Sequence, residues 1–381
     1  MDQLPELQAR LSGAMEEHGL WPADSPWVRP AMETFPRHVF APSRLWNWDG
    51  QAYVPVDRDA DPTQWESLVY AGPGDSTITQ VTDGLPSSSL SCEDVVADML
   101  DSLMLEPGQR TLELGAATGR NARLLAERTG PGRVTTVECD PQLASTAAVN
   151  LAATGGGVEV IAGDGTLGAP GIGQVLRVIS TFAVDEVPWS WVEQTQPGGR
   201  IVTPWGRLGH VALTVGSDGQ SATGWMQGLA TFMPARGIGQ GVAWEHAHDA
   251  QPLAEEGPFA RDLGLLHRDA NLLFALRVIA PDIRVRTAAV DGAINAWLHD
   301  GRTSWAMVKP GDGGSAVAQQ GGPRRLAAEL ESAWREWEDI GAPGLYEFGM
   351  TRTLDHQYIW AFHPETGPRW SSNDARPLRV A

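Results

Sequence analysis

The stretch TLELGAATGRNARLLA, residues 111–126, decides the fold that the sequence predicts. A short apolar strand runs into a loop of small residues, and the loop opens a helix. Gly115 can take the left-handed backbone conformation that such a turn needs, and Gly119 lets the backbone approach a ligand closely. The first N–H groups of the helix have no partner within it and can bind an anion. The pattern predicts a nucleotide-type ligand site.

The loop GAATG, residues 115–119, differs from the two common phosphate-binding loops. Its glycines are spaced GxxxG, whereas the dinucleotide fingerprint is GxGxxG, and no Lys-Ser/Thr pair of a P-loop follows. A loop without a lysine suits a ligand with little negative charge. S-adenosylmethionine is such a ligand, because its amino and sulfonium groups are positive and its carboxylate can bind at the helix N-terminus. We therefore predict it as the cofactor.

Acidic residues follow the next two predicted strands. Glu138 ends RVTTVEC, about 20 residues past the glycine loop, where a carboxylate can accept hydrogen bonds from ribose hydroxyls. Asp164, in the GDG of residues 163–165, can accept from an adenine amino group. A Glu at a strand end is usually only solvated, and GDG is usually only a turn. The glycine loop and both acidic residues in order, each after a strand, predict a nucleoside-binding domain.

Short β-type runs alternate with helical stretches over residues 95–215, which predicts a doubly wound α/β sheet. We expect a Rossmann-like sheet with helices on both faces, followed by an α+β C-terminal module. The expected parts are an N-terminal helical and otherwise irregular segment (1–75), a cofactor-binding core (76–237) and a C-terminal extension (238–381) that can dock a peptide.

The extension carries two local patterns. Residues 323–340 predict a helix with one apolar face, made by Leu326, Leu330, Trp334 and Trp337 at helical spacing. Residues 345–364 predict two strands around a turn at 354–356. The pair His246 and His248 lacks further metal-ligand spacing, and a surface loop is the preferred interpretation there.

Composition limits the partners. The 381 residues carry a formal net charge of −19, and such a chain repels a phosphate backbone. A neutral or basic peptide or a cationic cofactor suits this charge, although solubility alone would also explain it. Two cysteines give no disulfide framework or zinc cluster, and the start, MDQLPELQAR, lacks signal-peptide regions. We expect a cytoplasmic monomer without metal, nucleic-acid or membrane partners.

Further motifs line up with one family. They are FPRHVFAP (35–42), LEPGQRTLELGAATGRNARLLA, VTTVECDP, GDGTLG and VISTFAVDEVPWSWVEQTQPGGRIVTPWG. Over about residues 30–237 the sequence resembles the protein-L-isoaspartate O-methyltransferase family. The resemblance implies the class I methyltransferase fold for this sheet, S-adenosylmethionine as the cofactor and a peptide carboxylate as the methyl acceptor. The expected cofactor-binding residues are Glu113, Gly115, Ala116, Gly119, Asn121, Glu138, Cys139, Asp164 and Gly165.

The segment before the glycine loop carries the expected acceptor side. In the family an S-x-P turn places a hydroxyl near the transferred methyl, and Ser91-Cys92-Glu93 matches it with Glu in place of Pro. The resemblance therefore implies Ser91 as the catalytic residue. Ser91 with Asp94 also predicts a capping box, which is compatible because a helix N-terminus can bind a carboxylate. The preceding serines either line a peptide groove or form a flexible approach. The expected substrate-binding residues are Ser88, Ser89, Ser91 and Val184.

Three hypotheses for the function stay open. SSSLS (87–91) and the FGMT segment (348–351) resemble actinobacterial relatives that tailor ribosomally made peptides, in which a methylated Asp gives an aspartimide or isoAsp. The second is repair of isoaspartyl residues in damaged proteins, and the third is a protein that binds cofactor and peptide without catalysis. The long C-terminal part favours tailoring, because a repair enzyme needs no docking module.

Overall fold

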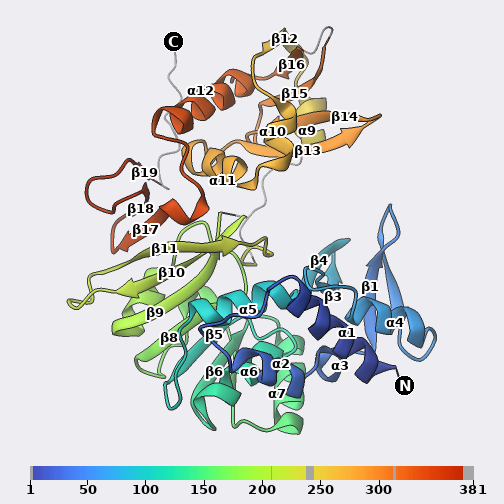
Figure 1. The fold of residues 1–381 in the computed structure, drawn as a ribbon, viewed down its shortest axis with the longest axis vertical. Helices are drawn as coiled ribbons and strands as arrows, with labels where there is room; N and C mark the ends of the chain where they lie inside the picture. The colour runs from blue at the N-terminus through green and yellow to red at the C-terminus, as the bar shows by residue number, and fades with distance from the viewer. Residues whose placement is uncertain (1–2, 207, 237–243, 312–314, 372–381) are drawn as a thin grey trace. The chain divides into compact units, whose positions relative to one another are not determined.

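The computed structural model describes residues 3–206, 208–236, 244–311 and 315–371 (Figure 1). The chain divides into two compact units. The first comprises Met1–Arg236 with Arg352–Leu354, and the second comprises Gly237–Thr351 with Asp355–Ala381.

The first unit is built on a sheet with the strand order β11-β10-β9-β8-β5-β6-β7. Strands β5 to β9 run parallel, and β10 and β11 continue the sheet antiparallel. The predicted doubly wound α/β sheet is confirmed, and its order reverses beside β5, where such sheets bind ligands. The strands are β5 Thr111–Leu114, β6 Val134–Glu138, β7 Glu159–Ala162, β8 Val175–Ser180, β9 Thr195–Trp205, β10 Gly209–Val215 and β11 Ser221–Leu229.

Helices cover the parallel strands. Every residue of β5 and β6 is buried, as expected for parallel strands with both faces covered. The connecting helices are α5 Glu93–Ser102, α6 Arg120–Thr129, α7 Pro141–Thr154 and α8 Trp189–Glu193. The helix and strand positions that the sequence predicts between residues 95 and 215 are therefore found.

The N-terminal part is more regular than predicted. Beyond the opening helix we expected irregular chain up to residue 75, and this is wrong, because further helices and a small sheet of order β2-β1-β3-β4 form there. Buried tryptophan supplies the packing, as Trp65 shows with its indole N–H donating to the Pro42 carbonyl. The elements are α1 Leu4–Glu17, α2 Val28–Thr34, α3 Arg37–Phe40, β1 Arg44–Trp48, β2 Tyr53–Asp57, α4 Pro62–Val69, β3 Thr77–Thr82 and β4 Leu85–Leu90.

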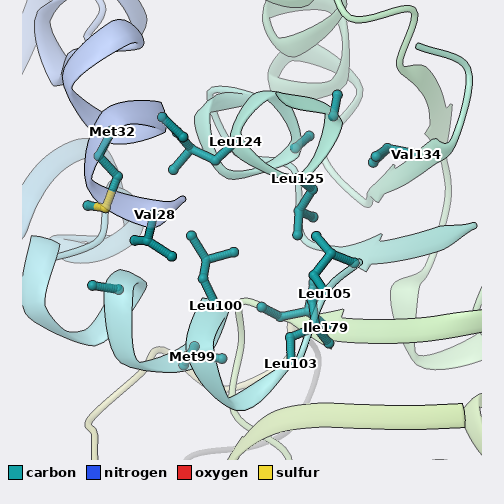
Figure 2. Packing of buried hydrophobic residues seen from close by; sticks show 14 of the residues in the cluster. Val28, Met32, Met99, Leu100, Leu103, Leu105, Leu124, Leu125, Val134 and Ile179 are labelled. Carbon is teal, nitrogen blue, oxygen red and sulfur yellow. The ribbon is translucent and has the colours of Figure 1, made fainter. Parts of the chain in front are cut away.

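One hydrophobic core joins this N-terminal part to the central sheet. Val28 and Met32 of α2 face Leu100 of α5 and Leu124 of α6 (Figure 2). These side chains are buried to within a few per cent, and burying each stabilises the fold by about 1.5–3 kcal/mol. The N-terminal helices are thus part of the core of the first unit.

Arg37, in the FPRHVFAP motif, joins separate elements of the N-terminal part. Its buried guanidinium donates to the carbonyls of Val69 (2.7 Å) and Ser91 (2.6 Å) and to Thr77 Oγ1 (2.8 Å). Burial lowers the pKa of Arg37, while the carboxylate of Glu93 opposes that shift. One side chain therefore ties α3 to α4, to the start of β3 and to the turn before α5.

The second unit has a sheet of its own, with the antiparallel order β12-β16-β15-β14-β13. The predicted helix over 323–340 is α12, and its predicted apolar face is buried. The two predicted strands near the C-terminus are β17 and β18. His246 and His248 lie on helix α9, so the surface-loop interpretation is wrong. The elements are α9 Trp244–Ala250, β12 Leu253–Phe259, α10 Leu263–Arg268, α11 Ala270–Ile279, β13 Arg284–Val290, β14 Ala293–His299, β15 Trp305–Pro310, β16 Ala316–Gly321, α12 Leu326–Asp339, β17 Phe348–Thr353, β18 Gln357–Ala361 and β19 Arg369–Ser371.

Replacing Arg37 tests its role in the fold. We expect Arg37→Met to lower the free energy of unfolding by about 3–5 kcal/mol, because buried carbonyls lose a charged donor. The control is Arg44→Met, since Arg44 is 61% exposed in its pair with Asp57 and should change the value by less than about 0.5 kcal/mol. Urea denaturation followed by circular dichroism measures both. Equal losses in the two variants would contradict the assigned role.

Candidate functional site

A cavity of about 830 Å³ lies within the first unit. Its walls are the ends of β5, β6 and β8 with the loops that follow them, the β3–β4 hairpin, the start of α5 and the segment after β11. This is the edge at which parallel strands end, beside the reversal of strand order. The lining includes Ser87, Ser88, Ser89, Ser91, Gly115, Ala116, Asn121, Glu138, Cys139, Asp164 and Gly165.

The glycine loop has the backbone that the sequence predicts. Gly115 has a φ of 101° and Gly119 one of 87°, both in the left-handed region. A Cβ on Gly115 would lie 2.3 Å from Thr181 Oγ1. Gly119 is the N-cap of α6 and offers no capping side chain, so the first N–H groups of that helix remain available to an anion. A Cβ on Gly119 would meet Leu151 of α7 at 3.1 Å, so this glycine packs the loop against α7 and does not bring the backbone close to a ligand as predicted.

Glu138 holds this loop from the neighbouring strand. Its carboxylate accepts from the Ala117 N–H (2.8 Å) and the Asp140 N–H (3.0 Å), and the residue is 6% exposed. Ala117 sits at a φ of 47°, unusual for a residue with a Cβ. Oε1 also accepts from the Cys139 thiol (3.6 Å), whereas Oε2 is bound by Ala117 and can accept a further bond. Glu138 can therefore support the loop and still accept from a ligand hydroxyl.

Asp164 caps the short 3₁₀-helix Gly165–Leu167 at the end of the cavity. Its Oδ1 accepts from Thr166 N–H (2.9 Å) and Thr166 Oγ1 (2.7 Å). The other carboxylate oxygen is not used in these bonds. The residue is thus fixed in place with an acceptor left for a ligand.

Glu113 lies behind the loop. It is fully buried, outside the cavity lining, and accepts from Asn121 Nδ2 (2.8 Å) and Thr136 Oγ1 (2.5 Å). Burial raises the pKa of Glu113 to about 7, and the nearby Glu138 carboxylate adds to the rise, against the effect of the two hydrogen bonds. Glu113 therefore orients Asn121, which does line the cavity.

The serines form one wall of the cavity as strand β4, so the interpretation as a flexible approach is wrong. Ser87 and Ser88 are used inside the hairpin, where Ser87 donates to Gln80 and Ser88 accepts from Thr79. Among the described residues, the hydroxyls of Ser89 and Ser91 make no hydrogen bond. These two line the cavity with donors to offer.

The predicted capping role of Ser91 is wrong. Helix α5 begins at Glu93, its N-cap is Cys92, and no side chain caps it. Arg37 binds the Ser91 carbonyl at 2.6 Å, and Glu93 is bound by Arg120 at 2.7 Å. With these two contacts, the N-cap is Cys92, one residue after the predicted Ser91. The Ser91 hydroxyl therefore stays at the cavity.

The structure brings most of the expected site residues together, and three lie outside the lining. Glu113 and Gly119 support the glycine loop from behind. Val184 is buried, and its N–H donates to the Pro204 carbonyl. It therefore packs in the sheet.

Sequence reasoning missed several residues of the cavity. Thr181 donates to the Gly115 carbonyl at 2.6 Å, and its place at the end of strand QVLRVISTF was an available signal. The segment after β11 had no such signal, because its contacts are to residues far away in sequence. The missed lining residues include Thr118, Arg120, Thr181, Phe182, Phe232, Met233 and Arg236.

The comparisons with known proteins agree with this geometry. Residues 15–227 match the family described as protein-L-isoaspartate(D-aspartate) O-methyltransferase. The protein-L-isoaspartate O-methyltransferase of Aeropyrum pernix is 35% identical over 217 residues, which cover 56% of this chain and 72% of that protein. Protein-L-isoaspartate O-methyltransferase 1 of Archaeoglobus fulgidus is 31% identical over 212 residues, covering 55% and 85%.

The chain belongs to this family. It is a methyltransferase, and its cofactor is S-adenosylmethionine. A solved structure named protein-L-isoaspartate O-methyltransferase shares the fold with a TM-score of 0.52 at 20% identity, over 93% of this chain and 99% of that one. The part of the chain that the structure describes has no helix that is long and apolar enough to cross a membrane.

The residues present fit S-adenosylmethionine. The α6 N-terminus is uncapped, and Glu138 and Asp164 retain acceptor capacity. No lysine lines the cavity among the described residues. We expect the loop and α6 to hold the amino-acid end of the cofactor, Glu138 the ribose and Asp164 the adenine.

Cofactor affinity tests this placement. We expect Glu138→Gln and Asp164→Ala each to weaken S-adenosylmethionine binding by about 10-fold or more, the size of one hydrogen bond to a charged group. Isothermal titration calorimetry measures the affinity, and circular dichroism confirms that the variants are folded. Unchanged affinity in both would show that the adenosine binds elsewhere. Asp218→Ala, in the turn between β10 and β11, is the control.

The pKa of Glu113 predicts a pH dependence of stability. Between its ordinary value of 4.5 and about 7, the folded state holds a proton that the unfolded state has released. The unfolding free energy should therefore fall as pH rises through that window. Glu113→Gln can accept from Asn121 through its Oε1 and donate to Thr136 Oγ1 through its Nε2, and it cannot ionise, so it should lose less stability between pH 5 and 8. Urea denaturation across this range measures the difference, and parallel curves would contradict it.

Proposed function

We propose that this enzyme methylates the carboxylate of an isoaspartyl residue in a peptide or protein. The observation that carries the proposal is the placement of Ser89 and Ser91, whose free hydroxyls line the same cavity as the cofactor loop. Hydroxyl donors suit a carboxylate acceptor. The names of the relatives from Aeropyrum pernix and Archaeoglobus fulgidus specify L-isoaspartate as the residue that they methylate.

The chemistry needs little from the protein. A carboxylate is ionised at neutral pH, so it requires no general base. When bound, S-adenosylmethionine supplies a methyl group on a positive sulfur. Ser89 and Ser91 donate to the acceptor carboxylate and hold one oxygen in line for the displacement, and the apolar walls exclude water. In the resulting ester, the next backbone nitrogen can close a succinimide ring and release methanol.

Cys92 takes no part as a nucleophile. Burial and the neighbouring Asp94 carboxylate raise the pKa of its thiol to about 12. The thiol therefore stays protonated at neutral pH, and a neutral thiol is a poor nucleophile.

The second candidate substrate is an Asp side chain in a constrained peptide, the tailoring reaction that SSSLS and FGMT suggest. The length of the chain no longer supports it over repair. The solved protein-L-isoaspartate O-methyltransferase aligns with 93% of this chain, and this extent reaches far into the second unit. A C-terminal extension therefore occurs in a protein of that name. We keep peptide docking by the second unit as part of this candidate.

One experiment separates the candidates. Purified protein and S-adenosylmethionine are incubated with two unstructured peptides that differ only in isoAsp or Asp at one position. Mass spectrometry should show a gain of one methyl group on the isoAsp peptide. Methylation of neither peptide, with cofactor bound, would contradict the isoaspartyl proposal and favour a dedicated constrained substrate.

The roles of Ser89 and Ser91 are tested with the isoAsp peptide as substrate. We expect Ser91→Ala to lower kcat/KM by about 10- to 100-fold, since it removes a hydrogen bond to a charged acceptor. Ser89→Ala should have a smaller effect in the same direction. Ser67→Ala, exposed on α4 and outside the cavity, is the matched control. Activity unchanged in both cavity variants would remove these hydroxyls from the site.

A further inference from the structure

We propose that Arg236 is a positioning residue for the acceptor peptide. It fastens the β3–β4 hairpin, which carries Ser89, to the strand end that carries Glu138. The inference rests on the proposed function, because it assigns a role in holding the peptide wall of the same cavity. Arg236 itself is the last residue of the first unit before Gly237.

The contacts of Arg236 reach two walls of the cavity. Its Nη1 donates to Asp140 Oδ2 at 3.0 Å, and its Nη2 donates to Gln80 Oε1 at 2.8 Å and to the Ser87 carbonyl at 3.3 Å. Gln80 Nε2 donates to the same Asp140 oxygen at 3.0 Å. The three side chains therefore form a closed ring, and one guanidinium holds both strands of the hairpin.

The hairpin has few other attachments. Strand β3 pairs with β1 through the single pair Trp46 and Ile78. The β3–β4 register is irregular on both sides of Gln80, and the turn at Asp83 is exposed. Among the described residues, the hydrogen bonds that join the hairpin beyond Ile78 to the rest of the unit are those to Asp140 and Arg236. Its outer half thus depends on this ring.

Both anchors of the ring are themselves fixed. Asp140 is the N-cap of α7, and its Oδ1 accepts from the N–H groups of Gln142 and Leu143. It lies two residues after Glu138, whose carboxylate accepts from its N–H. On the other side, the Ala235 N–H donates to the Ala183 carbonyl at 3.0 Å just before Arg236. The ring therefore transmits the position of the cofactor-side strands to the serine strand.

Direct recognition of a substrate carboxylate is the competing role. Arg120 and Arg236 are the cations in the described cavity lining, and Arg120 is buried and paired with Glu93. Arg236 is 42% exposed, so a carboxylate could approach it. Both of its Nη atoms are already bound within the ring, however, and a direct contact would have to break the bonds that hold the hairpin. Positioning is the role that uses the contacts present.

The test uses the full chain with Arg236→Met, Arg236→Lys and Gln80→Ala. Hydrogen exchange followed by mass spectrometry should show amides of residues 79–88 exchanging about 5- to 10-fold faster in Arg236→Met and Gln80→Ala, the size of one partly exposed ion-pair network. KM for the isoAsp peptide should rise by a similar factor, with kcat changed less than about twofold. Arg236→Lys keeps the positive charge but lacks the planar guanidinium. Its hairpin exchange and KM should therefore lie between those of the unmodified protein and those of Arg236→Met.

Hydrogen exchange, KM and cofactor affinity each have a control or a contrary outcome. Arg44→Met, in the same small sheet, should leave the exchange of the hairpin and KM unchanged. S-adenosylmethionine affinity, measured by calorimetry, should be unchanged in Arg236→Met. Unchanged hairpin exchange would overturn the proposal. A KM increase confined to peptides with a second carboxylate would overturn it in favour of direct recognition. Exchange needs no turnover, so failure to methylate any peptide would refute the proposed function and leave this test intact.

Discussion

The buried ion pair between Glu93 and Arg120 is the constraint on which the site depends. Two bonds of 2.7 and 2.8 Å join the side chains, which are 8% and 4% exposed. Removing such ions from water costs several kcal/mol each, so the pair is favourable only while its bidentate geometry is kept. Glu93 is the first residue of α5 and Arg120 the first of α6. The serine turn before one helix and the glycine loop before the other are therefore held at a fixed distance.

This pair also accounts for Glu93 in place of the proline of the family's S-x-P turn. Cys92 has φ −61° and ψ 149°, the extended conformation that a residue before proline adopts. Glu93 occupies the first position of α5, which proline favours. The turn at Ser91 thus keeps the shape that a proline would give, and the glutamate adds the carboxylate that Arg120 needs.

The sequence predicts those parts of the site that follow from local pattern. Alternating strands and helices, and the left-handed backbone of Gly115, depend on neighbouring residues and are found as expected. The capping prediction for Ser91 fails because Arg37, 54 positions earlier, binds its carbonyl. Arg236 was missed for the same reason, since its partner Gln80 lies 156 positions away. A pattern among neighbouring residues cannot predict a contact between residues that only folding brings together.

The apolar face of helix α12 shows how the second unit is packed. If the C-terminal extension only supported the methyltransferase core, the apolar face of α12 would have to pack against that core. The face is instead covered inside its own unit, where α12 contacts α11 and the sheet strands β12, β14, β15 and β16. The indole N–H of Trp337 donates to the Pro343 carbonyl, and that of Trp370 donates to Glu336. These two tryptophans therefore make their hydrogen bonds within the second unit. The second unit therefore completes a hydrophobic core of its own, which a module proposed to dock a peptide needs in order to hold its shape.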